Sequence, residues 1–323
     1  MSKYRDHLPQ LDGGIFLTDG GLETTLIFHD KLELPYFAAF HLMKEGAGTE
    51  ALRKYYRSYA SIACANGLGF VLESPTWRAN PDWSEKLGYS KAALSEVNRV
   101  AVALMRELRE QFETAHSPMV ISGCVGPRGD GYDPGQIMSE AEAEAYHSQQ
   151  IGFFRETDAD LVTAITITNT PEAIGIVRAA RTTGLPVVIS FTLETDGCLP
   201  TGQSLEEAID AVDAATGKVT AYYMINCAHP THFDTAIATS QPWVRRLRGV
   251  RANASRLSHA ELNEAPDLDD GNPLEFGAQY GDLLRRHPHI NVLGGCCGTT
   301  TVTLRKLHAC VRRLRRRKLE TRS

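Results

Sequence analysis

The feature that most constrains the fold is a regular alternation of short β-branched segments with longer segments of helical periodicity. Eight candidate strands occur along the chain, at Ile15–Thr18, Phe70–Glu73, Met119–Gly123, Asp160–Ile165, Val187–Phe191, Ala221–Asn226, Gly249–Asn253 and Ile290–Leu293. Helical segments lie between them, including Thr49–Asn66, Lys91–Glu113, Glu140–Arg155, Thr170–Thr182 and Ser204–Ala215. Alternating strands and helices favour a parallel sheet, and eight strands favour a closed barrel over an open doubly wound sheet. The sequence therefore predicts an α/β protein, a (β/α)8 TIM barrel.

No linker, repeat or low-complexity segment divides the chain. The segment Asn263–Pro273 is rich in acids, Asn and Pro, and we interpret it as a surface loop within the barrel. Residues 1–323 are therefore expected to form a single domain.

Composition limits the function classes. The 323 residues are 42% hydrophobic and 23% charged, which is ordinary for a water-soluble globular protein. The sequence has no apolar run of about 18 residues, which a membrane-spanning helix needs, and no signal-peptide apolar stretch at its N-terminus. We therefore expect a cytoplasmic protein with no membrane partner. Since disulfides are rare in the cytoplasm, the seven cysteines, an odd number, favour metal or thiol chemistry.

The net charge of −5 is unevenly distributed. Residues 305–323 carry nine Lys or Arg and one acid, a net charge of +8 that leaves −13 on the rest of the chain. An apolar helical face predicts a basic amphipathic helix at about 301–323, with Leu304, Leu307, Val311 and Leu314 turned inward. No aromatic residue interleaves with these charges, so we expect no nucleic-acid partner. Barrel helices can form dimer faces, which leaves a homo-oligomer open.

Three cysteines at two strand ends are the strongest chemical signal. Cys227 follows the sixth candidate strand, and the adjacent Cys296 and Cys297 follow the eighth. The carboxyl ends of barrel strands meet at one mouth, where active sites form. Adjacent strand residues point to opposite faces, but the glycines around the pair loosen the backbone and allow both to converge. Three thiolates are a set that zinc favours, and they leave its fourth position open for a substrate.

The other four cysteines are interpreted differently. A single buried cysteine usually acts as a small hydrophobic residue, and we assign that role to Cys64, Cys198 and Cys310. Cys124 ends the third candidate strand, so its role stays open between packing and the site.

Five motifs occur in an order that covers nearly the whole chain. They are Asp19-Gly20-Gly21-Leu22, Gly126-Pro127-Arg128-Gly129, Ser190-Phe191-Thr192 followed by Asp196-Gly197, Asn226-Cys227, and Gly294-Gly295-Cys296-Cys297-Gly298-Thr299. On these motifs the chain resembles the zinc-dependent homocysteine S-methyltransferase family. The resemblance implies a (β/α)8 barrel with Cys227, Cys296 and Cys297 as Zn²⁺ ligands. It also implies methyl transfer from a sulfonium-type donor, S-methylmethionine or S-adenosylmethionine, to a small-molecule thiol, homocysteine, which becomes methionine.

The same mouth supplies the residues that we expect to bind substrate, namely Asp19, Gly20, Gly21, Glu23, Trp77 and Asn253. Glycines let backbone N–H groups approach an anion closely, so the Asp-Gly-Gly segment suits a carboxylate. In the family this segment helps to hold the amino-acid part of homocysteine. Aromatic faces attract a sulfonium, so the candidates to line the path of the donor are Trp77, Tyr132 and Phe191.

The resemblance fails at a position that matters for the acceptor. After strand four, family members usually carry a glutamate that pairs with the ammonium of homocysteine, and here Ile165 takes its place. An aliphatic side chain cannot pair with a cation. Either Glu73 or Glu23 has taken over this role, or the acceptor lacks the amine. Arg78, after strand two, also departs from the family pattern and favours an anionic group on the donor or acceptor.

Three alternatives to homocysteine methylation stay open. The protein is a methyltransferase for a thiol without the amine contact, or a zinc-binding barrel that has lost activity, or a metal-free hydrolytic or lyase barrel. In the last case the cysteines serve packing or redox roles, and zinc content separates that case from the others.

Overall fold

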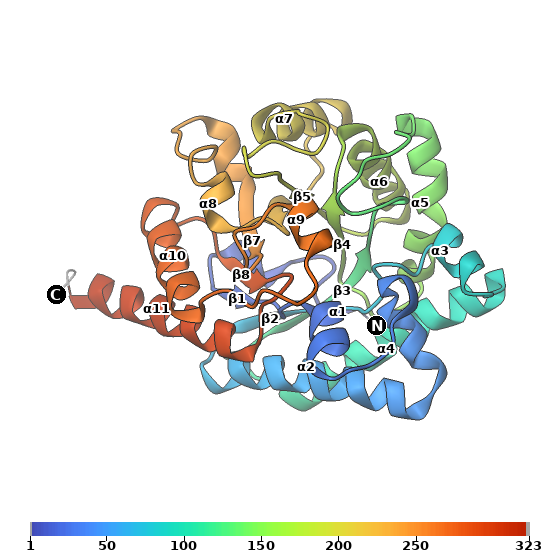
Figure 1. The fold of residues 1–323 in the computed structure, drawn as a ribbon, viewed down its shortest axis with the longest axis horizontal. Coiled ribbons are helices and arrows are strands. Elements are labelled where there is room, and N and C mark those ends of the chain that lie inside the picture. Colours follow the sequence, from blue (N-terminus) through green and yellow to red (C-terminus); the bar gives the residue numbers. More distant parts are fainter. Residues whose placement is uncertain (1, 321–323) are drawn as a thin grey trace.

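The computed structural model describes the backbone of residues 2–320 and the side chains of residues 2–313. In this described part, eight parallel strands form one closed barrel in the order β1-β2-β3-β4-β5-β6-β7-β8 (Figure 1). Their bounds are β1 (Phe16–Leu17), β2 (Gly69–Glu73), β3 (Met119–Val125), β4 (Leu161–Ile167), β5 (Val187–Thr192), β6 (Tyr222–Asn226), β7 (Leu247–Ala252) and β8 (Val292–Gly295). Pairing of β1 with β8 closes the ring. The predicted (β/α)8 TIM barrel is confirmed.

The first and last residues of each predicted strand differ by at most two positions from those of the observed strand. The α-helices are α1 (Leu22–Thr24), α2 (Gly46–Ala65), α3 (Pro81–Lys86), α4 (Lys91–Phe112), α5 (Glu140–Arg155), α6 (Thr170–Thr183), α7 (Leu205–Thr216), α8 (Pro230–Phe233), α9 (His259–Glu264), α10 (Pro273–Arg286) and α11 (Thr301–Glu320). Short 3₁₀ or π segments are η1 (Pro9–Asp12), η2 (Thr25–His29), η3 (Pro35–Phe37), η4 (Ala39–Lys44) and η5 (Pro242–Arg246). Local sequence explains several helix starts, because Ser139 and Ser204 each complete a capping box with the glutamate three residues later.

The barrel interior changes from apolar to polar along the strands. Near their amino ends lies one apolar cluster, made of Leu8, Phe16, Val71, Val120, Leu161, Val188, Tyr222, Met224 and Val292. Side chains two residues apart on a strand share a face. The next residues along that face are mostly polar and buried, and they include Thr18, Glu73, Ser122, Thr163, Ser190 and Asn226. Because buried polar groups need partners, this layer marks the carboxyl end of the barrel as a place for polar contacts.

The C-terminal helix α11 lies at one side of the barrel (Figure 1). Leu304, Leu307 and Val311 are buried, as predicted for its inward face. Leu314 lies outside the described side chains, and residues 321–323 lie outside the described backbone. Among the described residues, no helix is both long and apolar enough to cross a membrane.

The segment Asn263–Pro273 differs from the predicted surface loop. Its first residues belong to α9 and its last residue begins α10, so the irregular stretch covers only 265–272. Ser258 caps α9 and forms a capping box with Glu261. The side chain of Asn263 lines the cavity described below. Composition alone could not reveal this placement, since the cap lies upstream of the acidic segment.

Candidate active site

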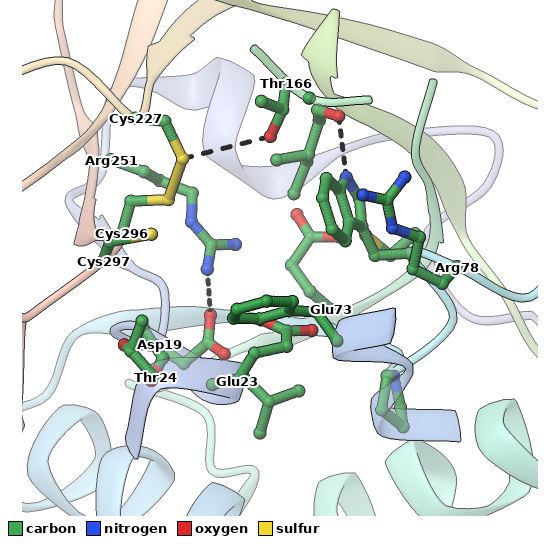
Figure 2. A pocket seen from close by; sticks show the side chains of 18 of the residues that line it. Asp19, Glu23, Thr24, Glu73, Arg78, Thr166, Cys227, Arg251, Cys296 and Cys297 are labelled. Carbon is green, nitrogen blue, oxygen red and sulfur yellow. Dashed lines mark hydrogen bonds and ion pairs between the residues drawn. A yellow bond between two sulfur atoms is a disulfide. The ribbon is translucent and has the colours of Figure 1, made fainter. Parts of the chain in front are cut away.

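The carboxyl ends of the strands enclose a cavity of about 170 Å³ (Figure 2). Its lining includes the acids Asp19, Glu23, Glu73 and Asp130, the bases Arg78 and Arg251, and the cysteines Cys124, Cys227, Cys296 and Cys297. This is the end of the barrel at which active sites of the fold form.

The three predicted metal ligands lie together. The sulfur atoms of Cys227, Cys296 and Cys297 are within 4.8 Å of one another, a spacing that one metal ion can bridge. Cys227 and Cys296 are joined by a disulfide, with their Cα atoms 5.5 Å apart, and Cys297 is a free thiol. The odd number of cysteines did not predict this bond, which is possible because convergence on one point also brings two sulfurs within bonding reach. Three thiols become available when the disulfide is reduced.

The backbone origin of this convergence differs from the prediction. Gly294 and Gly295 belong to β8 rather than to a loosened loop. A Cβ on Gly294 would overlap the Thr18 hydroxyl, so this glycine permits a close approach of β1 and β8. Gly298 has φ +74° and Cys227 itself has φ +53°. A left-handed residue directly after β6 takes the Cys227 side chain out of the strand alternation.

Asn226, the last residue of β6, braces the backbone beside Cys227. Its Oδ1 accepts hydrogen bonds from the Thr166 N–H at 2.9 Å and the Ser190 hydroxyl at 2.6 Å. Its Nδ2 donates to Thr166 Oγ1 at 2.8 Å. Thr166 has φ +65°, lies where the β4–β5 register shifts, and places its hydroxyl 4.0 Å from Cys227 Sγ. One amide therefore ties β4, β5 and β6 together next to the cysteines.

His259, the first residue of α9, contacts Cys227 and also the tyrosine that lies against Cys297. Its Nε2 donates to the Cys227 carbonyl oxygen at 2.6 Å, and its Nδ1 lies 3.0 Å from Glu194 Oε1. The imidazole stacks on Tyr132, with ring centroids 3.9 Å apart. The Tyr132 hydroxyl lies 3.5 Å from Cys297 Sγ. His259 thus reaches Cys227 directly and Cys297 through one aromatic ring.

A buried ion pair lies beside the cysteines. Arg251 Nη2 donates to Asp19 Oδ1 at 2.6 Å, and the Tyr55 hydroxyl donates to Asp19 Oδ2 at 3.2 Å. Burial raises the pKa of Asp19, while the Arg251 guanidinium opposes that rise. Burial also raises the pKa of Glu73 and of Glu23, each to about 7. Both carboxyls therefore change charge near neutral pH.

Five of the six predicted substrate-binding residues line the cavity, namely Asp19, Gly20, Gly21, Glu23 and Trp77. The Gly21 N–H already donates to the Thr299 carbonyl at 3.2 Å, so it is not free to hold an anion as predicted. Asn253 is not part of the cavity lining, and its Nδ2 donates to the Cys227 carbonyl at 3.1 Å. The predicted contact of Asn253 with substrate therefore stays a prediction.

Of the three aromatic residues predicted to line the path of the donor, two line the cavity and one does not. Trp77 lines the cavity and its Nε1 donates to the Ile165 carbonyl at 3.0 Å. The Arg78 guanidinium lies 4.2 Å from the Trp77 ring centroid and 4.0 Å from that of Trp83. Tyr132 also lines the cavity. Phe191 does not suit a donor path, because it is fully buried in the core against Tyr223.

Sequence reasoning missed several residues of the cavity. Arg251 could have been found, since a charge inside a predicted barrel strand needs a buried partner. Cys124 lines the cavity, which places it in the site rather than only in packing. Thr166 and Asn263 carried no signal, because a register shift and a short capped helix bring them to the mouth.

Comparison with known proteins decides the family. The family model described as Homocysteine S-methyltransferase matches residues 16–311. The chain belongs to this family. Among its relatives, Homocysteine S-methyltransferase 4 of Zea mays is 24% identical, with 93% of this chain and 90% of that protein covered. Selenocysteine Se-methyltransferase of Brassica oleracea var. italica is also 24% identical, with 92% of this chain and 88% of that protein covered.

Solved structures support the fold of this family member. The homocysteine methyltransferase MmuM from Escherichia coli in its oxidized form superposes with a TM-score of 0.72 at 21% identity, covering 94% of this chain and 97% of that chain. The metallated form of MmuM gives a TM-score of 0.71 at 20% identity, covering 94% and 98%. At this level of identity the likeness supports the barrel rather than the substrate.

Proposed function

We propose that this protein transfers a methyl group from a sulfonium donor, S-methylmethionine or S-adenosylmethionine, to the thiol of homocysteine, forming methionine. The observation that carries the proposal is the convergence of three cysteine sulfurs on one wall of a polar cavity at the carboxyl ends of the strands. Membership of the family supports the reaction class, and relatives named as homocysteine S-methyltransferases support the acceptor.

Zinc is the proposed ion for Cys227, Cys296 and Cys297. Tetrahedral coordination with zinc–sulfur bonds of about 2.3 Å spaces the sulfurs about 3.8 Å apart. Sulfurs that already lie within 4.8 Å fit this set once the Cys227–Cys296 disulfide is reduced. The metallated form of MmuM also supports a metal in this family. Zinc bound there would lower the pKa of the acceptor thiol, so that the acceptor reacts as a thiolate.

The surrounding side chains would hold the cysteines in place. His259 Nε2 and Asn253 Nδ2 both donate to the Cys227 carbonyl. The Tyr132 hydroxyl contacts Cys297. Such outer contacts orient the ligands before substrate binds and limit their movement during reaction.

The methyl transfer is an in-line displacement. A lone pair of the acceptor sulfur forms the new carbon–sulfur bond while the methyl–sulfur bond of the donor breaks. The bonding pair stays on the donor sulfur, which changes from a sulfonium cation to a neutral thioether. A neutral leaving group needs no proton, so the step requires no general acid from the protein.

Charge and aromatic surface support a cationic donor. The cavity lining carries four acids, Asp19, Glu23, Glu73 and Asp130, against two arginines. Trp77, Tyr132 and Phe37 contribute aromatic surface to the same lining, and aromatic faces attract cations. Arg78 adds a guanidinium, which suits the carboxylate of either proposed donor.

Ile165 supports a second candidate, a methyltransferase for a thiol without an amine. Its aliphatic side chain lines the cavity at the position where the family pattern has a glutamate. An Ile165→Glu variant assayed with homocysteine and with 4-mercaptobutanoate compares the two candidates. The second candidate is favoured if the wild type prefers 4-mercaptobutanoate and the variant prefers homocysteine.

The test of the proposed function combines metal content with methyl transfer. Protein purified under reducing conditions is expected to hold about one zinc per chain and to move a trideuterated methyl group from either donor to homocysteine, detected by mass spectrometry. The Cys296→Ala/Cys297→Ala double variant should lose both properties. Cys64→Ala is the matched control, because Cys64 lies on α2 away from the cavity lining. Bound zinc without methyl transfer to any thiol would refute the proposal.

A further inference from the structure

Three buried charged side chains of the cavity, Arg78, Arg251 and Glu73, lack part of their hydrogen bonding within the described residues. Arg251 is 6% exposed and Glu73 is 4% exposed, and both line the cavity. Within the described residues, neither Arg251 Nη1 nor Glu73 Oε2 has a hydrogen-bond partner. Leaving such groups buried and unpaired is costly, so a ligand that completes them gains affinity.

The two atoms belong to one local cluster. Arg251 Nη2 is held by Asp19 Oδ1 at 2.6 Å, and Arg251 Nε donates to the Gly295 carbonyl at 3.3 Å, which leaves Nη1 as the free side of the guanidinium. Arg251 also acts electrostatically on Glu73 and opposes the rise that burial causes in the pKa of Glu73. In Figure 2 the Arg251 and Glu73 side chains reach into the same space from different walls.

This cluster lies directly beside the cysteine wall. In the barrel, Arg251 of β7 is paired with Asn226 of β6 on one side and with Gly294 of β8 on the other. The Cys227 N–H donates to the Arg251 carbonyl at 3.2 Å. A small ligand whose sulfur contacts the cysteines therefore shares its cavity with Arg251 and Glu73.

We propose that Arg251 Nη1 and Glu73 bind the carboxylate and the ammonium of an α-amino-acid acceptor, and so select amino-acid thiols over their des-amino analogues. This inference rests on the proposed function and names the specificity residues of the same site. An α-amino acid carries one anionic and one cationic group on a single carbon, which matches the unpaired Arg251 Nη1 and the unpaired Glu73 Oε2 in a shared cavity. The ammonium contact thus comes from β2, since Ile165 of β4 cannot provide it.

Other charged groups of the cavity match this role less well. Arg78 Nε is also buried without a partner within the described residues. The rest of the Arg78 guanidinium is engaged, because it lies over Trp77 and Trp83, its Nη1 donates to the Gly129 carbonyl at 2.6 Å, and its Nη2 lies 3.7 Å from Asp130 Oδ2. Glu23 lies on the short helix α1 rather than on a strand, and it is half-buried, whereas Glu73 is buried. Glu73 combines strand placement, burial and an unpaired oxygen.

Calorimetric binding of methionine tests the inference without requiring catalysis. The ligands are L-methionine, its des-amino analogue 4-(methylthio)butanoate, and its decarboxylated analogue 3-(methylthio)propylamine, each titrated into the full-length reduced protein. The wild type should bind methionine at least about tenfold more tightly than either analogue, because each analogue loses one charge-assisted contact.

Glu73→Gln keeps the shape of the side chain and removes its charge. This variant should weaken methionine binding about tenfold and leave the affinity for 4-(methylthio)butanoate nearly unchanged, which abolishes the selectivity for the amine. Glu23→Gln is the parallel variant for the other carboxyl. Loss of amine selectivity in Glu23→Gln but not in Glu73→Gln would overturn the assignment, as would equal wild-type affinities for all three ligands or no methionine binding.

The failure of this inference and that of the proposed function are distinguishable. Selective methionine binding that Glu73→Gln abolishes, in a protein that methylates no thiol, supports the amino-acid site and refutes the proposed reaction. Methylation of homocysteine with amine selectivity unaffected by Glu73→Gln supports the reaction and refutes the role of Glu73.

Discussion

Replacing Asn226 with alanine provides a direct test of how the fold positions the cysteines. The Asn226 side chain is fully buried and makes three hydrogen bonds, of 2.9 and 2.8 Å with Thr166 and of 2.6 Å with Ser190. Asn226→Ala removes all three and leaves the Thr166 N–H buried without its acceptor. Thr166 holds a left-handed φ of +65°, so its backbone depends on these contacts.

The magnitude follows from the number of bonds. A buried intramolecular hydrogen bond contributes about 1 kcal/mol to the free energy of unfolding, so Asn226→Ala should cost about 3 kcal/mol. Ser190→Ala is the matched control, because it removes only the bond of the Ser190 hydroxyl and should cost about 1 kcal/mol. Cys227 directly follows Asn226, so freeing this backbone should also weaken zinc binding about tenfold or more.

Urea unfolding followed by circular dichroism measures the stability change, and competition with a chromophoric chelator measures zinc affinity on the reduced proteins. The reasoning is refuted if Asn226→Ala loses no more stability than Ser190→Ala. It is also refuted if Asn226→Ala is destabilised as expected and binds zinc as tightly as the wild type, because the brace would then have no influence on the cysteines.

Three further predictions concern the same site. Cys297→Ser should reduce bound zinc well below the wild-type level, measured by atomic emission on reduced protein, while Cys310→Ser should not; equal zinc in both variants contradicts the ligand assignment. His259→Phe keeps an aromatic ring against Tyr132 but removes the donor to the Cys227 carbonyl, so zinc affinity should fall about tenfold; unchanged affinity in the chelator assay would show that this contact does not orient Cys227. Burial raises the pKa of Glu73 from 4.5 to about 7, so between these values the folded protein keeps a proton that the unfolded chain releases. The free energy of unfolding of the wild type relative to Glu73→Gln should therefore fall by up to about 3 kcal/mol as the pH rises through this window, measured by urea unfolding at several pH values; a difference independent of pH contradicts this titration.

Local patterns were enough to predict the barrel and one wall of its cavity. Strand periodicity and helical periodicity are properties of neighbouring residues, so the eight strands lie within two residues of their predicted bounds. In a closed parallel barrel all carboxyl ends meet at one mouth. This rule alone brings Cys227 to Cys296 and Cys297 from 69 residues away.

Backbone details of the site were not predictable from the same patterns. Glycine content indicated a loosened loop after β8, whereas the left-handed residues that matter include Cys227 and Thr166. A positive φ in a non-glycine residue has no local signature, because surrounding contacts impose it. Asn253 was expected to contact substrate, and the hydrogen bond from its Nδ2 to the Cys227 carbonyl was not predicted, because strand position does not specify where a side chain donates.

The sequence by itself determined the order of the strands, the end of the barrel that carries the site, and the cysteines that form one wall. Only the tertiary structure decided how the charges are paired. Asp19 and Arg251 are 232 residues apart, and they meet because β1 and β7 both flank β8 in the closed ring. Within the described residues, burial then leaves Nη1 of Arg251 and Oε2 of Glu73 without a hydrogen-bond partner. Such pairing depends on distances across the barrel, which no pattern of neighbouring residues encodes.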